Sequence, residues 1–209
     1  MKKERKLIFI TSLMAFLPTI IGLILYKKLP DKMPSHWDFE GNIDGYTDKL
    51  GFIIFLGTFL LIMHLLCVFI TSLDKKNENQ SRKILKLVLW IIPAVSVMLS
   101  ALIYPTALGA KINASRLLFS FLGFIFVVIG NYLPKVTQNK YIGIKIPTTL
   151  KSEENWNKTH RMAGPLWIAG GFMLILLAFI KTNEITNIII FVSVITLCTI
   201  IPVVYSIII

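Results

Sequence analysis

Six long runs without Asp, Glu, Lys or Arg dominate this sequence. They span residues 7–26, 50–73, 87–110, 117–134, 162–180 and 185–209. Roughly 20 apolar residues in a helix, rising about 1.5 Å per residue, cross the hydrocarbon layer of a bilayer. Lipid offers no partner for backbone N–H and C=O groups, so spanning segments form helices that satisfy their own hydrogen bonds. The sequence therefore predicts an all-α polytopic integral membrane protein with six transmembrane helices, located in the cell membrane.

The composition agrees with a membrane protein. The chain is 55% hydrophobic and its mean hydropathy is +0.72, whereas soluble domains contain about 45–50% apolar residues. In a soluble protein, the net charge of +11 would indicate a nucleic-acid partner. Beside membrane spans, basic residues instead set orientation and contact anionic lipid. We therefore expect the lipid bilayer to be a partner, and we expect no direct nucleic-acid binding.

The distribution of Lys and Arg predicts the orientation in the membrane. The N-terminal segment and the loops 74–86 and 135–161 together carry 15 basic residues, and the alternate loops 27–49, 111–116 and 181–184 carry 7. Cytoplasmic segments are enriched in Lys and Arg. Both termini are therefore expected in the cytoplasm, and the 27–49 loop is expected outside. We interpret the first span as a retained anchor that Pro18 bends, because no small-residue cleavage site follows it.

The outer loop contains the segment PSHWDFEGNIDGYTDK, residues 34–49. Pro34 favours an extended start. Gly41-Asn42 and Asp44-Gly45 are turn signals. We expect a compact, ordered loop on the outer membrane face, with Trp37 and Tyr46 at the level of the lipid headgroups.

The inner loop contains the segment YIGIKIPTTLKSEENWNKTHRMAG, residues 141–164. Gly143 and Pro147 indicate turns that flank a short strand-like stretch, residues 142–146. Ser152 followed by two glutamates is typical of a helix start. From there Trp156, His160 and Ala163 fall on one helical face. We expect an interfacial helix that leads into the fifth span, with Trp156 and His160 on its exposed edge.

Few residues in this sequence indicate catalysis, proton transfer or metal binding. His64 lies within the second span, where an ionisable group is a functional candidate; a neutral histidine bonded to a neighbouring helix is the alternative. Cys67 and Cys198 lie within apolar spans and are interpreted as small packing residues. The spacing of His36, His160 and nearby acids is weak evidence for a metal site. No nucleophile elbow occurs in the sequence. We expect no catalytic residue, metal or cofactor.

The two polar segments resemble a known family. Residues 34–49 resemble the P-x-H-W-(N/D)-x-x-G-x-x-D-G-Y-x-x-K signature of domain of unknown function 1648. Residues 130–167 resemble the second signature of the SdpI-type toxin immunity family. The resemblance implies two regions, 1–73 with two spans and the outer loop, and 74–209 with four spans and the inner loop. In the outer loop, the residues that match and are implied to bind toxin are Pro34, His36, Trp37, Gly41, Asp44, Gly45 and Lys49. In the inner loop, the matching residues implied in cytoplasmic signalling are Asn139, Gly143, Ile144, Pro147, Thr149, Trp156, Thr159, His160, Arg161 and Gly164, and Asn131 and Leu150 also match.

The resemblance implies a bacterial immunity protein that confers resistance to a secreted sporulation-delaying peptide toxin. It also implies a receptor that holds a cytoplasmic ArsR-type autorepressor at the membrane when toxin is bound. Lys145 and Thr148 depart from the Arg and Trp common in the family, and both lie in the inner loop. The residues alone leave two other classes of protein open. One is a small-molecule or ion transporter that uses His64, and the other is a membrane enzyme that uses His36 or His160.

Overall fold

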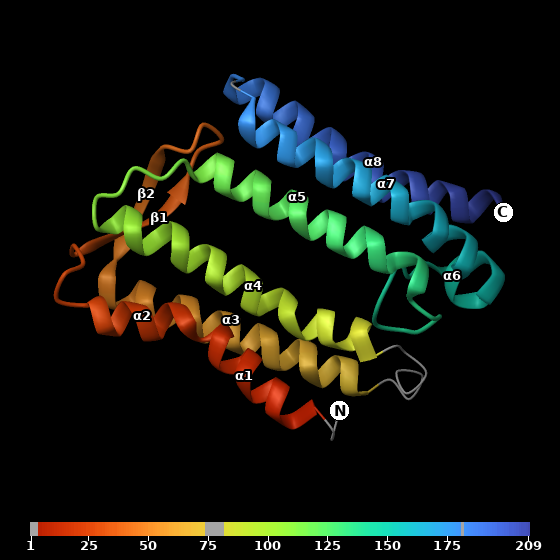
Figure 1. The fold of residues 1–209 in the computed structure, drawn as a ribbon, viewed down its shortest axis with the longest axis horizontal. Coiled ribbons are helices and arrows are strands. Elements are labelled where there is room, and N and C mark those ends of the chain that lie inside the picture. The colour runs from red at the N-terminus through yellow and green to blue at the C-terminus, as the bar shows by residue number, and fades with distance from the viewer. Residues whose placement is uncertain (1–3, 74–81, 181) are drawn as a thin grey trace. The chain divides into compact units, whose positions relative to one another are not determined.

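The computed structural model describes residues 4–73, 82–180 and 182–209 (Figure 1). Among these residues, five helices are long and apolar enough to cross a membrane, and a bent pair of shorter helices makes a sixth if the pair forms one span. The prediction of an all-α polytopic membrane protein is confirmed. The basic residues at positions 2 and 3, and most of the 74–86 loop, lie outside the described residues.

The chain folds as two compact units. The first contains residues up to 73 together with 85–114, and the second contains residues 115–209 together with the short stretch that ends at Ile84. The division at residue 73 that the family motifs imply stays a prediction.

The first unit begins with the bent span. Helix α1 (Arg5–Ala15) and helix α2 (Leu17–Leu25) meet at 45°, and Pro18 lies in the first turn of α2. The predicted bend at this proline is confirmed. Hydroxyl groups of helix α4 (Arg82–Ala107) bond carbonyls at the bend: the Ser96 hydroxyl donates to Ala15 O at 3.2 Å, and the Tyr104 hydroxyl donates to Pro18 O.

The outer segment forms a β-hairpin rather than an irregular loop. Strand β1 (Lys32–Trp37) pairs antiparallel with strand β2 (Ile43–Asp48). The hairpin connects α2 to helix α3 (Lys49–Ser72) in the chain (Figure 1). Met33 of β1 is fully buried against Ile53 of α3 and Ile103 of α4. The hairpin is therefore anchored in the core of the first unit.

The second unit contains helix α5 (Ala114–Tyr132), the 3-10 helix η3 (Leu133–Lys135), the short helix α6 (Pro147–Lys151), helix α7 (Glu153–Phe179) and helix α8 (Glu184–Ile208). Helices α7 and α8 run side by side from a short turn (Figure 1). A Cβ at Gly123 or Gly130 of α5 would lie within 2.8 Å of a backbone oxygen of α7, so the two helices pack backbone to backbone.

One feature of the inner segment differs from the sequence-based expectation, because residues 142–146 form no strand. The helix expected after Ser152 leads into the fifth span as predicted, since α7 continues from Glu153 through Pro165 into the span. Pro165 is exposed, so the ring lies on the outer surface of the helix, and only one backbone donor is lost.

The predicted orientation can be tested by labelling. In a background without Cys67 and Cys198, single cysteines replace Ser35 in β1 and Asn157 in α7, both exposed. An impermeant thiol reagent added to intact cells should label position 35, and should label position 157 only after the membrane is opened. Labelling of position 157 but not position 35 in intact cells would reverse the assigned orientation.

Candidate functional site

Two contacts between charged or polar side chains join the strands of the hairpin. Lys32 contacts Asp48 at 2.7 Å across the open end of the hairpin, and His36 Nδ1 lies 2.5 Å from Asp44 Oδ1 nearer the turn. Lys49, whose side chain is 13% exposed, donates to Leu29 O at 2.8 Å and lies 3.1 Å from Asp31. Three motif residues, His36, Asp44 and Lys49, therefore shape the hairpin itself.

The hairpin turn is built around Asp38. Its carboxylate accepts hydrogen bonds from the backbone N–H groups of Glu40 and Asn42 and from the Asn42 side chain. The side-chain bond from Asn42 is the main cause that lowers the pKa of Asp38, so this stabilisation is lost as the pH falls through that pKa. Gly41 completes the turn with φ +92°, which confirms the predicted turn at this glycine.

The second predicted turn, at Asp44-Gly45, is wrong. Both residues lie in β2, and Gly45 pairs with His36. A Cβ at position 45 would lie 2.8 Å from the His36 Cβ. The glycine is thus required by the close approach of the two strands rather than by a turn.

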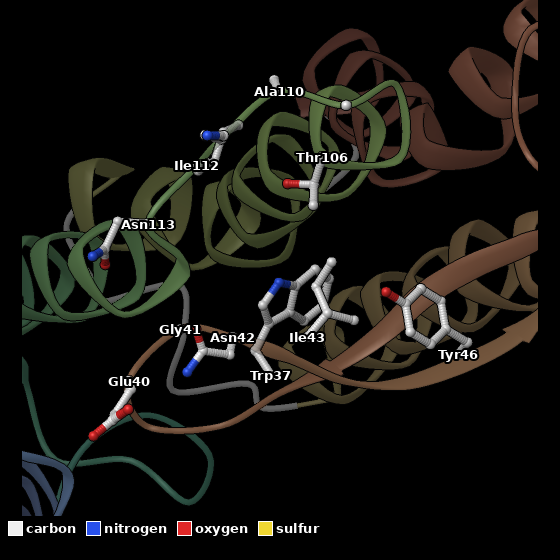
Figure 2. A pocket seen from close by; sticks show the side chains of 12 residues that line it. Trp37, Glu40, Gly41, Asn42, Ile43, Tyr46, Thr106, Ala110, Ile112 and Asn113 are labelled. Carbon is white, nitrogen blue, oxygen red and sulfur yellow. The ribbon is translucent and has the colours of Figure 1, made fainter.

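An open pocket of about 600 Å³ lies in the first unit beside the hairpin (Figure 2). The hairpin contributes Trp37, Ile43 and Tyr46 to its wall, and the end of α4 with the following connection contributes Thr106 and residues 109–113. Tyr46 is 60% exposed. The hairpin and residues 111–113 belong to the loops 27–49 and 111–116, which are predicted on the same, outer side of the membrane, so their meeting agrees with the predicted topology. Thr106, Gly109 and Ala110 lie at the end of the predicted span 87–110.

The inner motif folds into a buried cluster in the second unit. Trp156 and His160 are 0% and 1% exposed, and their rings stack with centroids 4.1 Å apart. Trp156 Nε1 donates to Val136 O at 2.7 Å. His160 Nε2 accepts from the Ile144 N–H at 2.9 Å, so Nδ1 carries the proton and donates to Trp156 O at 2.8 Å. The expected exposed edge is therefore wrong, because residues 136–144 fold back over both rings.

Two more motif residues fix the backbone of this cluster. Asn139, 1% exposed, donates to Thr137 O and Ile142 O, and its Oδ1 accepts from two backbone N–H groups. Thr149 is fully buried, donates to Ile144 O at 2.8 Å, and accepts from the Ile146 N–H. These polar side chains therefore hold the irregular loop in one conformation.

Four residues that match the inner motif are exposed, namely Asn131, Pro147, Leu150 and Arg161. Thr159 is fully buried, and Gly164 packs against Pro134 and Gly130 O. The helix start at Ser152 is confirmed, since its hydroxyl accepts from the Asn155 N–H at 3.1 Å. A partner in the cytoplasm would therefore meet mainly the exposed residues, with the buried ones supporting them.

Sequence reasoning missed one polar network. Asn155 Nδ2 donates to Ser206 O at 2.8 Å, Ser206 Oγ donates to Asn155 Oδ1 at 2.6 Å, and Thr148 Oγ1 lies 2.5 Å from Ser206 Oγ. These bonds tie α6 and α7 to the end of α8. The C-terminal end of the chain and the inner loop therefore lie on the same side of the second unit, as the predicted topology requires.

Within the spans, His64 is fully buried and its Nε2 lies 3.0 Å from the Thr11 hydroxyl of α1. The contact between helices agrees with one of the two alternatives, a histidine bonded to a neighbouring helix. Both cysteines are free. Among the described residues, no group of three or more His, Cys, Asp or Glu could hold a metal ion.

Comparison with known proteins supports the family resemblance. Residues 135–206 match the SdpI/YfhL protein family, and residues 13–62 match domain of unknown function 1648. Over residues 135–206 the chain is similar to the SdpI/YfhL family. It is 25% identical over 170 residues to Immunity protein SdpI of Bacillus subtilis (strain 168), and the alignment covers 81% of this chain and 80% of that protein. No solved structure matches. The chain is thus a multi-pass cell membrane protein that is similar to an immunity protein.

Proposed function

We propose that this chain protects the cell that carries it against a secreted peptide toxin of the sporulation-delaying class, by binding rather than by catalysis. The similarity to Immunity protein SdpI over most of both chains carries this proposal. The outer motif lies within residues 13–62 and the inner motif from Asn139 onward lies within residues 135–206, so both motifs fall within matched regions. The outer hairpin, which holds six of the seven matched outer residues and is followed directly by the seventh, Lys49 of α3, is the proposed toxin-binding element.

The accessible part of the inner motif is the proposed contact for a cytoplasmic ArsR-type repressor. Among these exposed residues, Pro147 and Leu150 offer apolar surface and Arg161 offers a positive charge. If the helices have two arrangements, a toxin that binds one arrangement better increases the population of that arrangement. The inner surface then changes together with the outer surface. Toxin binding outside would in this way control repressor binding inside.

The function is tested by expressing the chain in a host that a synthetic sporulation-delaying peptide kills. Cells with the protein should survive peptide concentrations that kill cells with the empty vector. Survival should depend on the amount of protein in the membrane. If the expressed protein reaches the membrane and gives no survival against peptides of this class, the immunity proposal is wrong.

A transporter is the second candidate, and one observation favours it. His64 Nδ1 is buried without a hydrogen-bond partner, which is the situation of a group that exchanges a proton or binds a passing ligand. The described parts of the six spans place no carboxylate beside it to complete a proton relay.

Replacing His64 with Ala separates the two candidates. For an immunity protein, the variant loses only the bond to Thr11, about 1 kcal/mol, together with a small cavity, and protection persists at normal abundance. For a transporter, uptake or proton coupling in vesicles disappears although abundance is normal. Protein abundance, survival and vesicle uptake are measured on the same preparations.

A further inference from the structure

Two residues that line the open pocket beside the hairpin each carry a buried polar atom that has no hydrogen-bond partner. The atoms are Trp37 Nε1 and Thr106 Oγ1, and among the described residues only His64 Nδ1 shares this condition. Buried polar side-chain atoms are paired in the large majority of cases, and each exception calls for an explanation. The two residues come from segments about 70 positions apart in the sequence and meet at the same pocket.

Figure 2 shows how these atoms lie. The indole nitrogen of Trp37 is on the side of the ring that points toward the α4–α5 connection, and the Thr106 side chain projects from the end of α4 into the same space. An indole N–H only donates, so it requires an acceptor, whereas a threonine hydroxyl donates or accepts. The missing partner is therefore a molecule with at least one acceptor and a second polar group nearby.

The other residues that line the pocket indicate which further groups the bound molecule carries. Trp37, Ile43, Tyr46 and Ile112 present apolar surface, and Glu40 and Lys111 add one charge of each sign at the pocket. Pockets of about 300–1,000 Å³ hold small ligands, so about 600 Å³ accommodates a short stretch of peptide rather than a folded protein. An extended peptide offers carbonyl and N–H groups at regular spacing together with apolar side chains.

We propose that this pocket is the docking groove for an extended segment of the secreted peptide, whose backbone carbonyl accepts from Trp37 Nε1–H and whose neighbouring amide bonds the Thr106 hydroxyl. This assignment rests on the proposed immunity function and deepens it. It adds Thr106, Lys111 and Ile112, which lie outside the family motif, as residues that recognise the toxin. The binding element is then two loops rather than the hairpin alone.

The test uses the full chain in lipid nanodiscs and a synthetic sporulation-delaying peptide as the probe. Thr106→Val keeps the shape and removes the hydroxyl, and Trp37→Phe keeps a smaller aromatic ring and removes the N–H. Each variant should weaken peptide binding by about three- to tenfold, as expected for one lost hydrogen bond. Thr106→Val should not lower thermal stability, because its hydroxyl has no partner in the free protein. Trp37→Phe also loses part of its packing against the core of the first unit, so Thr106→Val is the deciding variant. Trp90→Phe, at an exposed site on α4 outside the pocket, is the matched control and should bind normally.

Each other outcome has a definite meaning. If wild type binds the peptide and both variants bind it equally well, the two atoms are solvated by water and the groove assignment is wrong, while the immunity function stands. If the affinity of Thr106→Val falls only together with its thermal stability, the residue has a structural role and the assignment is again wrong. If wild type binds no peptide of this class, the immunity function fails, and with it the assignment of the peptide to this pocket.

Discussion

Replacing Trp156 with Ala is expected to destabilise the second unit by about 3–5 kcal/mol, the usual range for removing a buried tryptophan. The side chain is fully buried, stacks on His160 and donates to Val136 O. Its removal leaves a cavity, an unpaired carbonyl and an unsupported His160. We expect low membrane abundance and a lower melting temperature in detergent, so that protection and any repressor recruitment fail together.

Two comparisons make this prediction specific. Trp90 is 41% exposed on α4, and Trp90→Ala should change stability far less. Trp156→Phe keeps most of the ring contact and loses one hydrogen bond, about 1 kcal/mol. If Trp156→Ala accumulates and melts like the wild-type protein, the cluster does not hold the inner loop, and Trp156 is available as a contact residue after all.

A pair of glycines tests the same cluster from the backbone side. Gly143 and Gly109 both have positive φ, +112° and +93°. A Cβ at position 143 would lie 2.5 Å from His160 Nε2 and 2.8 Å from the Trp156 ring, whereas a Cβ at position 109 meets nothing within 4 Å. Gly109→Ala should therefore show only backbone strain, about 1 kcal/mol. Gly143→Ala should cost clearly more, because it also displaces the stacked rings.

The spans were predictable because their cause is local. Charge-free length decides whether a helix crosses a bilayer, and that property can be read directly along the chain. The bend at Pro18 was predictable for the same reason, since a proline lacks the backbone donor that a straight helix needs. The start of α7 at Ser152 and Glu153 was a local capping signal.

The outer hairpin was not predictable from local patterns. Pro34 lies in β1 and Gly45 lies in β2, and both residue types disfavour strands. The pairing depends instead on contacts between the two ends of the segment, such as Lys32 with Asp48, and on the burial of Met33 in the unit core. Contacts of this kind join residues that lie far apart in the segment. A search for turn residues, which considers only a few neighbouring positions, does not detect them.

The burial of the inner motif shows the same limit. The helical spacing placed Trp156 and His160 on one face, and that was correct. Whether the face is exposed depends on where residues 136–144 fold, and those residues are held by side-chain bonds from Asn139 and Thr149. The outer pocket was even less predictable from the sequence, because its walls come from two parts of the chain that only the tertiary fold brings together.

Replacing Gly45 with Val is expected to abolish protection and repressor recruitment together. A Cβ at position 45 would lie 2.8 Å from the His36 Cβ, so the strands must separate or shift. Overpacking of this kind costs about 1–3 kcal/mol. It also displaces Tyr46 and Trp37, which line the proposed groove. Gly51 in the first turn of α3 is the matched control, because a Cβ there meets nothing within 4 Å, and Gly51→Val should protect normally.

The inner counterpart of this experiment is Arg161→Glu. Arg161 is exposed, so the change reverses a surface charge without disturbing the Trp156–His160 cluster. If the outer hairpin binds the toxin and the accessible inner residues bind the repressor, this variant should keep survival and lose membrane localisation of the repressor. The measurement is survival, repressor localisation and membrane abundance for Gly45→Val, Gly51→Val and Arg161→Glu in one toxin-sensitive host. Loss of both outputs by Arg161→Glu at normal abundance would mean that the two faces do not divide the work, and that protection depends on the helix bundle as a whole.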